Sequence, residues 1–443
     1  MTHIDSVDPS AEHSGTPDSW TVPTSGRPAR RTIVQGAAWT IPVVAASVAT
    51  PAFAASAVLE LAFDAPAYTF TACTTRSVSV LATTGGTPAA GAAVTITLPA
   101  DLTSGGAQTV SATTGSDGRV SIPVTAGNVA QTGLALTAVS GATTAGASAS
   151  TTATEGSAIR YVFNNEATST TSNGSVPSGA ATVGPRLYLT ASGDLYHSST
   201  KVASGVTSAE GFRDQQNRDV ADFVADGVFY RFVSGDPAPK ALGTGVPAGS
   251  TVHAPAYYVT PSGELRVSDG TLVTTGVTSA DSFRDAGNQN VIDVLTGTEI
   301  VRYVGTTKNQ VITTGVQAGS TVLAPGYHLT PDGRLFNGSL LITTGVTSAD
   351  VFRDQQGRNI ADVIQNGALV RYGVFADVTV PQTRIASGVP SDATAYAPDC
   401  YVTKDGRAFS GTKLIATGVA SAFSFRDVQG RTVFDTMTNA ICP

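Results

Sequence analysis

The 443-residue sequence is poor in the residues that carry most enzyme chemistry, with three cysteines, five histidines and two tryptophans. It contains no C-x-x-C, P-loop, G-x-S-x-G or H-E-x-x-H motif. Basic residues form no block and the net charge is −7, whereas nucleic acid binding requires a positive surface. We therefore expect no catalytic, metal or cofactor site and no nucleic acid partner. A triad assembled across the fold, as in a secreted hydrolase, is a remote alternative, because sequence does not reveal spatial neighbours.

Only one sizeable apolar run is present, at residues 33–49, and it follows Arg30 and Arg31. The small residues Ala54 and Ala55 close the segment in an A-x-A pattern, so residues 1–54 are predicted to be an export signal that is cleaved between these two alanines. The paired arginines and the following Thr-Ile-Val resemble the twin-arginine signals of actinobacterial surface proteins. A Sec signal is the alternative.

Cleavage at that point changes the composition of the remaining chain. Trp20 and Trp39 leave with the signal, as do three arginines and four acidic residues, so the net charge becomes −6. No second long apolar run exists, and we expect no membrane span in the mature chain. The predicted location is extracellular or at the cell surface.

The three cysteines are Cys73, Cys400 and Cys442. An exported chain meets an oxidising environment, so one disulfide is expected, with one thiol left over. Cys400 and Cys442 lie near the end of the chain in the same repeat copy. We therefore predict a bond between Cys400 and Cys442 and a buried thiol at Cys73.

Residues 55–157 are rich in Ala, Thr, Ser and Gly and nearly free of charge. Apolar and polar residues alternate in short runs, as in residues 119–124, and turn residues separate the runs, which predicts an all-β sandwich. The segments 87–95 and 113–120 resemble bacterial immunoglobulin-like domains of the invasin and intimin group. That resemblance implies a spacer that holds another module away from the cell surface.

From residue 158 to residue 443 one unit is written four times. Its anchor is Phe-Arg-Asp, beginning at Phe212, Phe283, Phe352 and Phe425, with steps of 71, 69 and 73 residues. A fixed period of this kind indicates stacked or circular supersecondary units. Each copy divides into two halves, and one half carries a hairpin whose tight turn predicts glycine with positive φ at positions 193, 263, 333 and 406.

The two ends of this repeat region complement each other. Residues 159–162 match the second half of a hairpin, whereas residues 433–437 match its first half. Pairing them would close a circle and leave no exposed sheet edge. We predict an all-β chain in which an immunoglobulin-like β-sandwich precedes a closed β-propeller of about eight short modules, arranged as four double repeats. The half-repeat resembles propellers of the regulator-of-chromosome-condensation and tachylectin types, which implies protein or sugar binding.

A second aspartate follows each Phe-Arg-Asp aspartate by eight residues. We expect each Phe-Arg-Asp arginine to tie its module to the neighbouring module through one of these carboxylates. The alternative is a carboxylate array for calcium, but calcium loops place carboxylates at every second residue. The expected structural latches are Arg213, Asp222, Arg284, Asp293, Arg353, Asp362, Arg426 and Asp435.

These features together predict an exported, non-catalytic binding or adhesion protein, which we expect to be a monomer. In this interpretation a spacer presents a propeller to an unknown protein or glycan partner at the cell envelope. The absence of tryptophan after cleavage weakens the glycan version, since sugar sites favour large aromatic platforms. A structural envelope component without a specific ligand is the alternative.

Overall fold

The computed structural model describes residues 58–164, 167–285, 287–323, 325–354, 356–375, 378–379, 382–439 and 442. Every regular element in these ranges is a β-strand, as the sequence predicts, and no helix in them could span a membrane. The predicted cleavage site at Ala54 and Ala55 lies outside the described residues.

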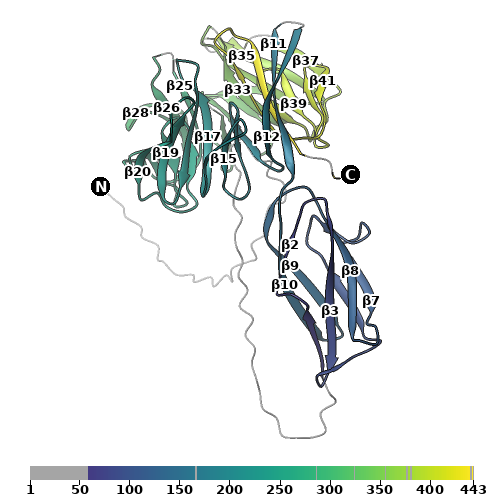
Figure 1. Cartoon of the computed structure of the whole chain (residues 1–443). Coiled ribbons are helices and arrows are strands. Elements are labelled where there is room, and N and C mark those ends of the chain that lie inside the picture. Colours follow the sequence, from purple (N-terminus) through teal and green to yellow (C-terminus); the bar gives the residue numbers. More distant parts are fainter. Residues whose placement is uncertain are drawn as a thin grey trace, which may run out of the picture.

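The first ten strands form two sheets that face each other, seen in the lower part of Figure 1. One sheet has the order β1-β3-β8-β6, with β4 beside β3, and the other has the order β2-β10-β9-β5-β7. Their bounds are β1 (Leu59–Phe63), β2 (Ala67–Phe70), β3 (Thr75–Thr84), β4 (Thr87–Pro88), β5 (Ala93–Thr97), β6 (Leu102–Thr103), β7 (Thr109–Thr113), β8 (Arg119–Ala126), β9 (Gln131–Ser140) and β10 (Thr143–Thr151).

Alternating side chains from both sheets fill the space between them. In β8, for example, Val120, Ile122 and Val124 are buried, while the intervening residues are exposed. They join one apolar cluster with residues such as Tyr68 and Leu136 from the facing sheet. Strands of period two that bury one face each make a β-sandwich, as the sequence predicts.

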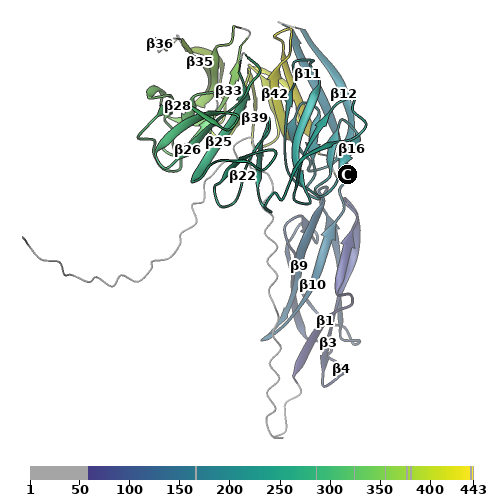
Figure 2. The same ribbon diagram turned by 90° about the vertical axis from the view of Figure 1, so that its left-hand side faces the viewer.

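The remaining strands form eight further antiparallel sheets. In chain order the first strands are β11 (Glu155–Asn164) and β12 (Ala167–Pro177), and the last are β42 (Val419–Arg426) and β43 (Thr432–Thr438). These four make a single sheet of order β12-β11-β43-β42. In both Figure 1 and Figure 2, β11 accordingly runs beside strands from the C-terminal end of the chain.

The other seven sheets each use consecutive strands. The first three of these sheets are made of β13 (Ala181–Gly184), β14 (Leu187–Leu189), β15 (Leu195–His197) and β16 (Thr200–Ala203); of β17 (Val206–Arg213), β18 (Asp219–Ala225), β19 (Val228–Val233) and β20 (Lys240–Thr244); and of β21 (Thr251–His253), β22 (Tyr257–Val259), β23 (Leu265–Val267) and β24 (Leu272–Thr274). The next two are made of β25 (Val277–Arg284), β26 (Asn290–Thr296), β27 (Glu299–Val304) and β28 (Thr307–Thr313); and of β29 (Thr321–Leu323), β30 (Tyr327–Leu329), β31 (Leu335–Asn337) and β32 (Leu340–Thr343). The last two are made of β33 (Val346–Arg353), β34 (Asn359–Gln365), β35 (Ala368–Phe375), β36 (Val378–Thr379) and β37 (Thr383–Ser387); and of β38 (Thr394–Tyr396), β39 (Cys400–Val402), β40 (Ala408–Ser410) and β41 (Lys413–Ala416).

Each sheet packs against the sheet before it and the sheet after it. Eight apolar clusters lie one at each junction, and each draws side chains from two successive sheets. The last and first sheets share such a cluster through Ala408 and Tyr161. Because both faces of a sheet are covered, strands such as β18 are buried along their whole length.

The pairing predicted for the two ends of the repeat region is confirmed. β11 pairs antiparallel with β43, and the register places Ile159 opposite Thr436 and Val162 opposite Val433. The two halves of one hairpin plan, separated by most of the chain, thus occupy adjacent strands. Each end supplies the edge that the other lacks.

The predicted turn glycines are also confirmed. Gly193, Gly263, Gly333 and Gly406 have φ of 83°, 76°, 79° and 78°. A Cβ at Gly193 would lie 3.0 Å from the carbonyl oxygen of Val206, the first residue of the next sheet. The carbonyl of Gly193 accepts the amide of the same valine at 2.8 Å, so this turn docks one sheet on the next. Only glycine meets both demands.

The predicted disulfide between Cys400 and Cys442 is wrong. The structure joins Cys73 to Cys442, with Cα atoms 5.0 Å apart, and leaves Cys400 as a buried thiol. Cys400 packs inside the cluster between the last and first sheets. Cys442 lies beyond the end of β43, beside the sandwich, where Cys73 precedes β3. The bond therefore ties the sandwich to the C-terminal end of the repeat region.

Candidate functional site

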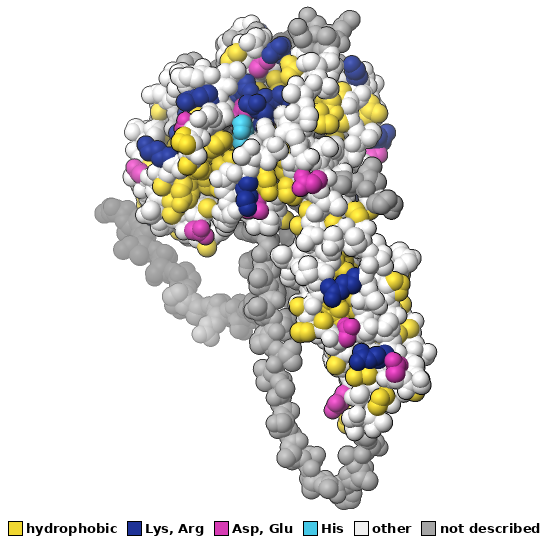
Figure 3. Space-filling model, in the orientation of Figure 1, with side chains coloured by type: hydrophobic (Ala, Val, Ile, Leu, Met, Phe, Trp, Pro, Cys, Tyr) yellow, Lys and Arg dark blue, Asp and Glu magenta, His cyan; other side chains and the backbone are white. Residues whose placement is uncertain are grey.

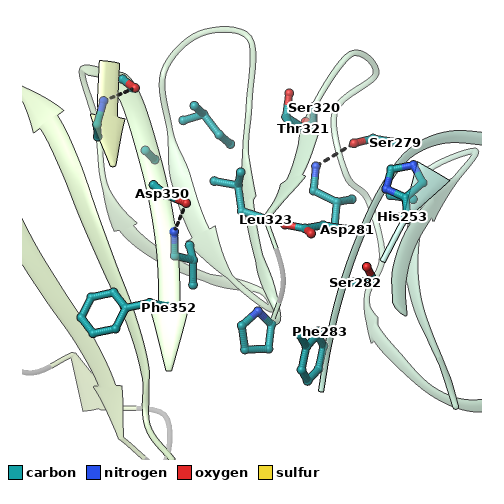
Figure 4. A pocket seen from close by; sticks show the side chains of 18 of the residues that line it. His253, Ser279, Asp281, Ser282, Phe283, Ser320, Thr321, Leu323, Asp350 and Phe352 are labelled. Atoms are coloured by element: carbon teal, nitrogen blue, oxygen red, sulfur yellow. Dashed lines mark hydrogen bonds between the residues drawn. The ribbon is translucent and has the colours of Figure 1, made fainter. Parts of the chain in front are cut away.

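A cavity of about 630 Å³ is lined by the first strands of five successive sheets, β21, β25, β29, β33 and β38. It follows β25 along its whole length. Figure 4 shows Ser279, Ser320 and Thr321 at one end and Phe283 and Phe352 at the other. The volume falls within the range of small-molecule sites.

Two of the hydroxyls on its wall, those of Ser279 and Ser348, belong to a repeated Val-x-Ser at the start of β25 and β33. Ser279 Oγ accepts the amide of Val322 at 2.9 Å, and Ser348 Oγ accepts the amide of Ala395 at 3.0 Å. Each bond joins the first strand of one sheet to the first strand of the next. The same serines therefore position the sheets and give the cavity a polar lining.

Carboxylates lie halfway along the cavity, where Figure 4 shows Asp281 and Asp350. Asp350 Oδ2 accepts the amide of Ala397 at 2.7 Å, and the equivalent Glu210 accepts the amide of Ala254 at 3.0 Å. The fourth copy has Phe423 at this position. Buried backbone amides need acceptors, so these acids also hold successive sheets together.

The four second aspartates of the repeat are fully buried. Asp222, Asp293, Asp362 and Asp435 have 0% of their surface exposed. We expected the Phe-Arg-Asp arginines to pair with these aspartates, and the structure shows that this expectation was wrong. Each binds an arginine directly across its sheet through both carboxylate oxygens, with N–O distances of 2.6–2.7 Å; the pairs are Asp222–Arg231, Asp293–Arg302, Asp362–Arg371 and Asp435–Arg160.

These carboxylates nevertheless reach the next sheet, through its backbone. Oδ2 of Asp222 accepts the amide of Ala256 at 2.6 Å, and Oδ2 of Asp435 accepts the amide of Arg186 at 2.8 Å. The other two copies repeat this contact, at Gly326 and Asp399. Each aspartate is thus bound on one side by an arginine of its own sheet and on the other by the neighbouring sheet.

The first aspartates of the repeat lie elsewhere. Asp214 Oδ1 accepts the amide of Arg218 at 2.8 Å and closes a turn, and Asp354 does the same for Arg358. The two aspartates of each pair are therefore not brought together. Among the described ranges no three acidic, histidine or cysteine side chains converge as metal ligands would.

The Phe-Arg-Asp arginines, Arg213, Arg284, Arg353 and Arg426, contact a ring instead of a second aspartate. The guanidinium of Arg284 lies 5.0 Å from the ring centre of Phe212, in the preceding copy, and Arg353 lies 5.3 Å from Phe283. Arg426 lies over Phe352, and Arg213 completes the cycle over Phe425 of the last copy. Such contacts favour a cation electrostatically.

One of these arginines belongs to a charged cluster found in the first copy alone. Asp219 accepts hydrogen bonds from Arg213 at 3.0 Å, from Arg186 at 2.5 Å and from His197 at 3.0 Å. Burial would raise the pKa of Asp219, but the bond from His197 and the two guanidiniums outweigh burial, so the pKa lies below its usual value. Asn290 and Asn359 occupy the equivalent position in the next two copies. Figure 3 shows several Lys and Arg side chains close to a histidine on the face of the repeat region that it draws.

The arginines that hold the buried aspartates were missed as partners. The sequence did carry a signal, because Arg231, Arg302 and Arg371 each follow the buried aspartate by nine residues. Nine residues across a tight hairpin place two side chains opposite each other, as the register of β18 and β19 confirms.

Comparison with known proteins adds little to this geometry. No protein-family model matches the chain, and no curated protein matches it in sequence. A structure search finds the crystal structure of invasin, a bacterial integrin-binding protein, at 11% identity over 78% of this chain and 82% of that one. The TM-score is 0.21.

Two structures of the surface-layer protein SbsC also match, each at 12% identity. They cover 86% and 83% of this chain and 63% and 62% of theirs, with TM-scores of 0.12 and 0.11. The chain thus spans less than two thirds of each SbsC structure that it matches. Similarity at this level carries no argument about fold or function, which must come from the chain itself.

Proposed function

We propose that this chain is an exported, non-catalytic binding protein of the cell surface or extracellular space. In this proposal residues 1–54 are the export signal, residues 55–157 form an immunoglobulin-like spacer, and residues 158–443 form a closed β-propeller that binds a protein or glycan of the cell envelope. The observation that carries the proposal is the cavity, because the first strands of five successive sheets converge on it.

The cyclic order of contacts supports a propeller. Innermost strands contact one another in the series β42, β13, β17, β21, β25 and β29, and the series continues through β33 and β38 back to β42. The contact from β29 to β33 is made through the adjacent strand β30. Eight junction clusters and the pairing of β11 with β43 follow the same order. Radial repetition of four-stranded sheets defines a propeller.

The strand order of the sandwich supports the immunoglobulin-like assignment. β1, β3 and β8 lie in the order of immunoglobulin strands A, B and E, and β10, β9 and β5 lie in the order G, F and C. The two-residue strand β6 extends the first sheet, and β7 extends the second. The disulfide at Cys73 fixes this sandwich to the end of the ring, as a spacer that carries a binding module requires.

The cell-surface location rests on the arginine-led apolar leader, the small residues before Ala55 and the disulfide, which suits an oxidising compartment. Expression of the full gene product with its own leader tests the location, and mass spectrometry of the exported protein tests cleavage before Ala55. Incubation of the exported protein with fractionated cell envelope tests binding. Saturable binding to one fraction is expected. A protein that stays in the cytoplasm, or that binds no fraction, would contradict the proposal.

One observation favours the alternative of a structural component that assembles with itself. Leu272, Leu341 and Leu414 recur at equivalent positions of the outermost strands β24, β32 and β41 and are 45–49% exposed. Repeated apolar side chains on edge strands can join copies edge to edge. Sedimentation analysis separates the two functions: a binding module stays monomeric up to high concentration, whereas a structural component forms ordered assemblies that Leu341→Lys weakens.

A further inference from the structure

Two sets of arginines alternate around the repeat region, and every Phe-Arg-Asp phenylalanine contacts one arginine of each set. Phe283, for example, lies beneath Arg302 at 5.0 Å and Arg353 at 5.3 Å. Phe212 lies beneath Arg231 at 5.5 Å and Arg284 at 5.0 Å. The two sets share the same rings, yet their electrostatic environments differ.

The first set is charge-compensated. Arg231, Arg302, Arg371 and Arg160 each hold a buried aspartate through two hydrogen bonds, the geometry that suits a planar guanidinium. These arginines have a structural task within their sheets. Their charge is already matched, so they attract little further negative charge.

The second set differs in three of its four members. Arg213 has Asp219, but Arg284, Arg353 and Arg426 form no ion pair with any carboxylate of the described residues. They donate to neutral oxygens instead: Arg284 to the side chain of Asn288 at 2.6 Å, Arg353 to the side chain of Asn359 at 3.2 Å and Arg426 to the carbonyl of Gly430 at 2.7 Å. Three partly buried cations therefore lack a direct counter-charge.

Two of these arginines, Arg284 and Arg353, have a pKa below its ordinary value. Burial lowers the pKa of Arg284, and the nearby Arg231 lowers it further, although Asp222 and Asp214 at longer range act in the opposite direction. Burial likewise lowers the pKa of Arg353, and Arg302 adds to that effect. An arrangement that disfavours the free cation is one that an anion would stabilise.

Arg284 and Arg353 both line the cavity. They directly follow Phe283 and Phe352, which Figure 4 places at the end of the cavity opposite Ser279, Ser320 and Thr321. A ligand in this space would thus meet two cations at one end, the carboxylates of Asp281 and Asp350 halfway along, which can accept hydrogen bonds from hydroxyls, and serine and threonine hydroxyls at the other end. That combination suits a molecule with one acidic group and several hydroxyls.

We propose that the cavity binds an acidic sugar, whose carboxylate or phosphate is held by Arg284 and Arg353 and whose hydroxyls face the serine and threonine lining. This inference rests on the proposed binding function and specifies its ligand class. The guanidiniums present flat, multiply donating surfaces that match both kinds of oxyanion. Their stacking on phenylalanine leaves fewer rotamers to be lost when a ligand is bound.

Calorimetric titration of the intact exported protein tests the proposal. The probes are glucuronate, which carries one carboxylate, and glucose 6-phosphate, with glucose as the neutral counterpart of both. At least one acidic probe should bind, with an affinity at least tenfold above that of its neutral counterpart, and the difference should shrink as salt is raised. Comparison of the two acidic probes shows which oxyanion is preferred.

Arg284→Gln combined with Arg353→Gln should reduce affinity for the acidic probe at least tenfold. Arg284→Lys combined with Arg353→Lys keeps the charge and should retain part of the binding. Arg407→Gln is the matched control, since this arginine pairs with Asp405 on an exposed hairpin and should leave affinity unchanged. Circular dichroism and the thermal transition establish that each variant is folded.

Equal binding of acidic and neutral probes, absence of binding to both acidic probes, or full affinity in the double glutamine variant would each overturn the proposal. The envelope-binding assay separates this failure from failure of the proposed function. A protein that binds an envelope fraction but no acidic probe keeps its binding function and loses this site. A protein that binds neither loses both.

Discussion

Arg160 and Asp435 lie 275 positions apart in the chain, yet their side chains form two parallel hydrogen bonds of 2.7 and 2.6 Å. The same aspartate accepts the amide of Arg186, so one buried carboxylate joins the first strand of the repeat region, the last strand and the second sheet. In the other three copies the equivalent pair lies within one hairpin. Arg160 and Asp435 instead lie on β11 and β43, so this pair joins the two ends of the repeat region.

Asp435→Ala should therefore destabilise the protein strongly. It leaves Arg160 without its carboxylate and the amide of Arg186 without its acceptor, and removal of one partner of a buried pair costs about 3–5 kcal/mol. Chemical denaturation measures the change. Arg407→Ala, at an exposed pair, is the control and should change the unfolding free energy by less than about 0.5 kcal/mol. Equal stability of the Asp435 variant and the parent would refute the role of this pair.

The disulfide gives a second prediction. Peptide mapping without reduction should recover Cys73 linked to Cys442, with Cys400 alkylated after unfolding as a free thiol. Cys73→Ser should lower the unfolding free energy by about 2–5 kcal/mol, because the bond closes a very long loop. Cys400→Ser should leave the crosslink in place. A crosslinked peptide that contains Cys400 bonded to Cys442 would contradict the pairing of Cys73 with Cys442.

His328 predicts a pH dependence of stability. It is buried in β30 and stacked on Phe336 with ring centres 4.9 Å apart, and burial lowers its pKa from 6.5 to about 4. Between these values the unfolded chain takes up a proton that the native state does not, so the unfolding free energy falls as pH falls from 6.5 to 4. We expect a loss of about 1–3 kcal/mol across this window.

The other copies supply a matched variant for that experiment. Tyr258 and Tyr401 occupy the position equivalent to His328. His328→Tyr should therefore fold and should flatten the stability profile between pH 4 and pH 6.5. An unchanged slope in this variant would show that another group titrates in the window.

Asp219 titrates with the same sign as His328, but at lower pH. Its pKa lies below its usual value, so the stability that its charge contributes is present above about pH 4 and is lost as pH falls through the lower native value. Asp219→Asn should cost about 1–3 kcal/mol at neutral pH, because Arg186 and Arg213 lose their counter-charge. The difference from the parent should vanish in acid. Asn359→Asp, the reciprocal change in a copy that lacks His197 and Arg186, is the comparison variant.

The repeat made the backbone plan predictable. Phe-Arg-Asp and the hairpin glycines recur because every copy must dock on its neighbour in the same way, and periodicity of that kind is visible in sequence. The match between residues 159–162 and residues 433–437 predicted the seam for the same reason. Alternation of apolar residues likewise predicted the sandwich strands, since each buries one face.

Side-chain partners were harder to predict, since equal spacing in the sequence does not reveal which residue a side chain faces. Arg213 and Asp222 recur together, but they lie on adjacent strands out of register, and Asp222 faces Arg231 instead. The disulfide failed for a related reason. Sequence proximity favoured Cys400, whereas Cys442, which follows β43, is bonded to Cys73 of the sandwich. Contacts between separate parts of a chain leave no periodic signal.

Hydrogen exchange of the intact protein tests the closed ring most directly. Amides of β11 and β43 that pair across the seam should be protected as strongly as those of β34 and β35, which lie inside a sheet made of consecutive strands. An open array would leave both strands as sheet edges, and their amides would exchange as fast as those of the outermost strand β28. Fast exchange at both strands would contradict the ring, and strong protection would support it.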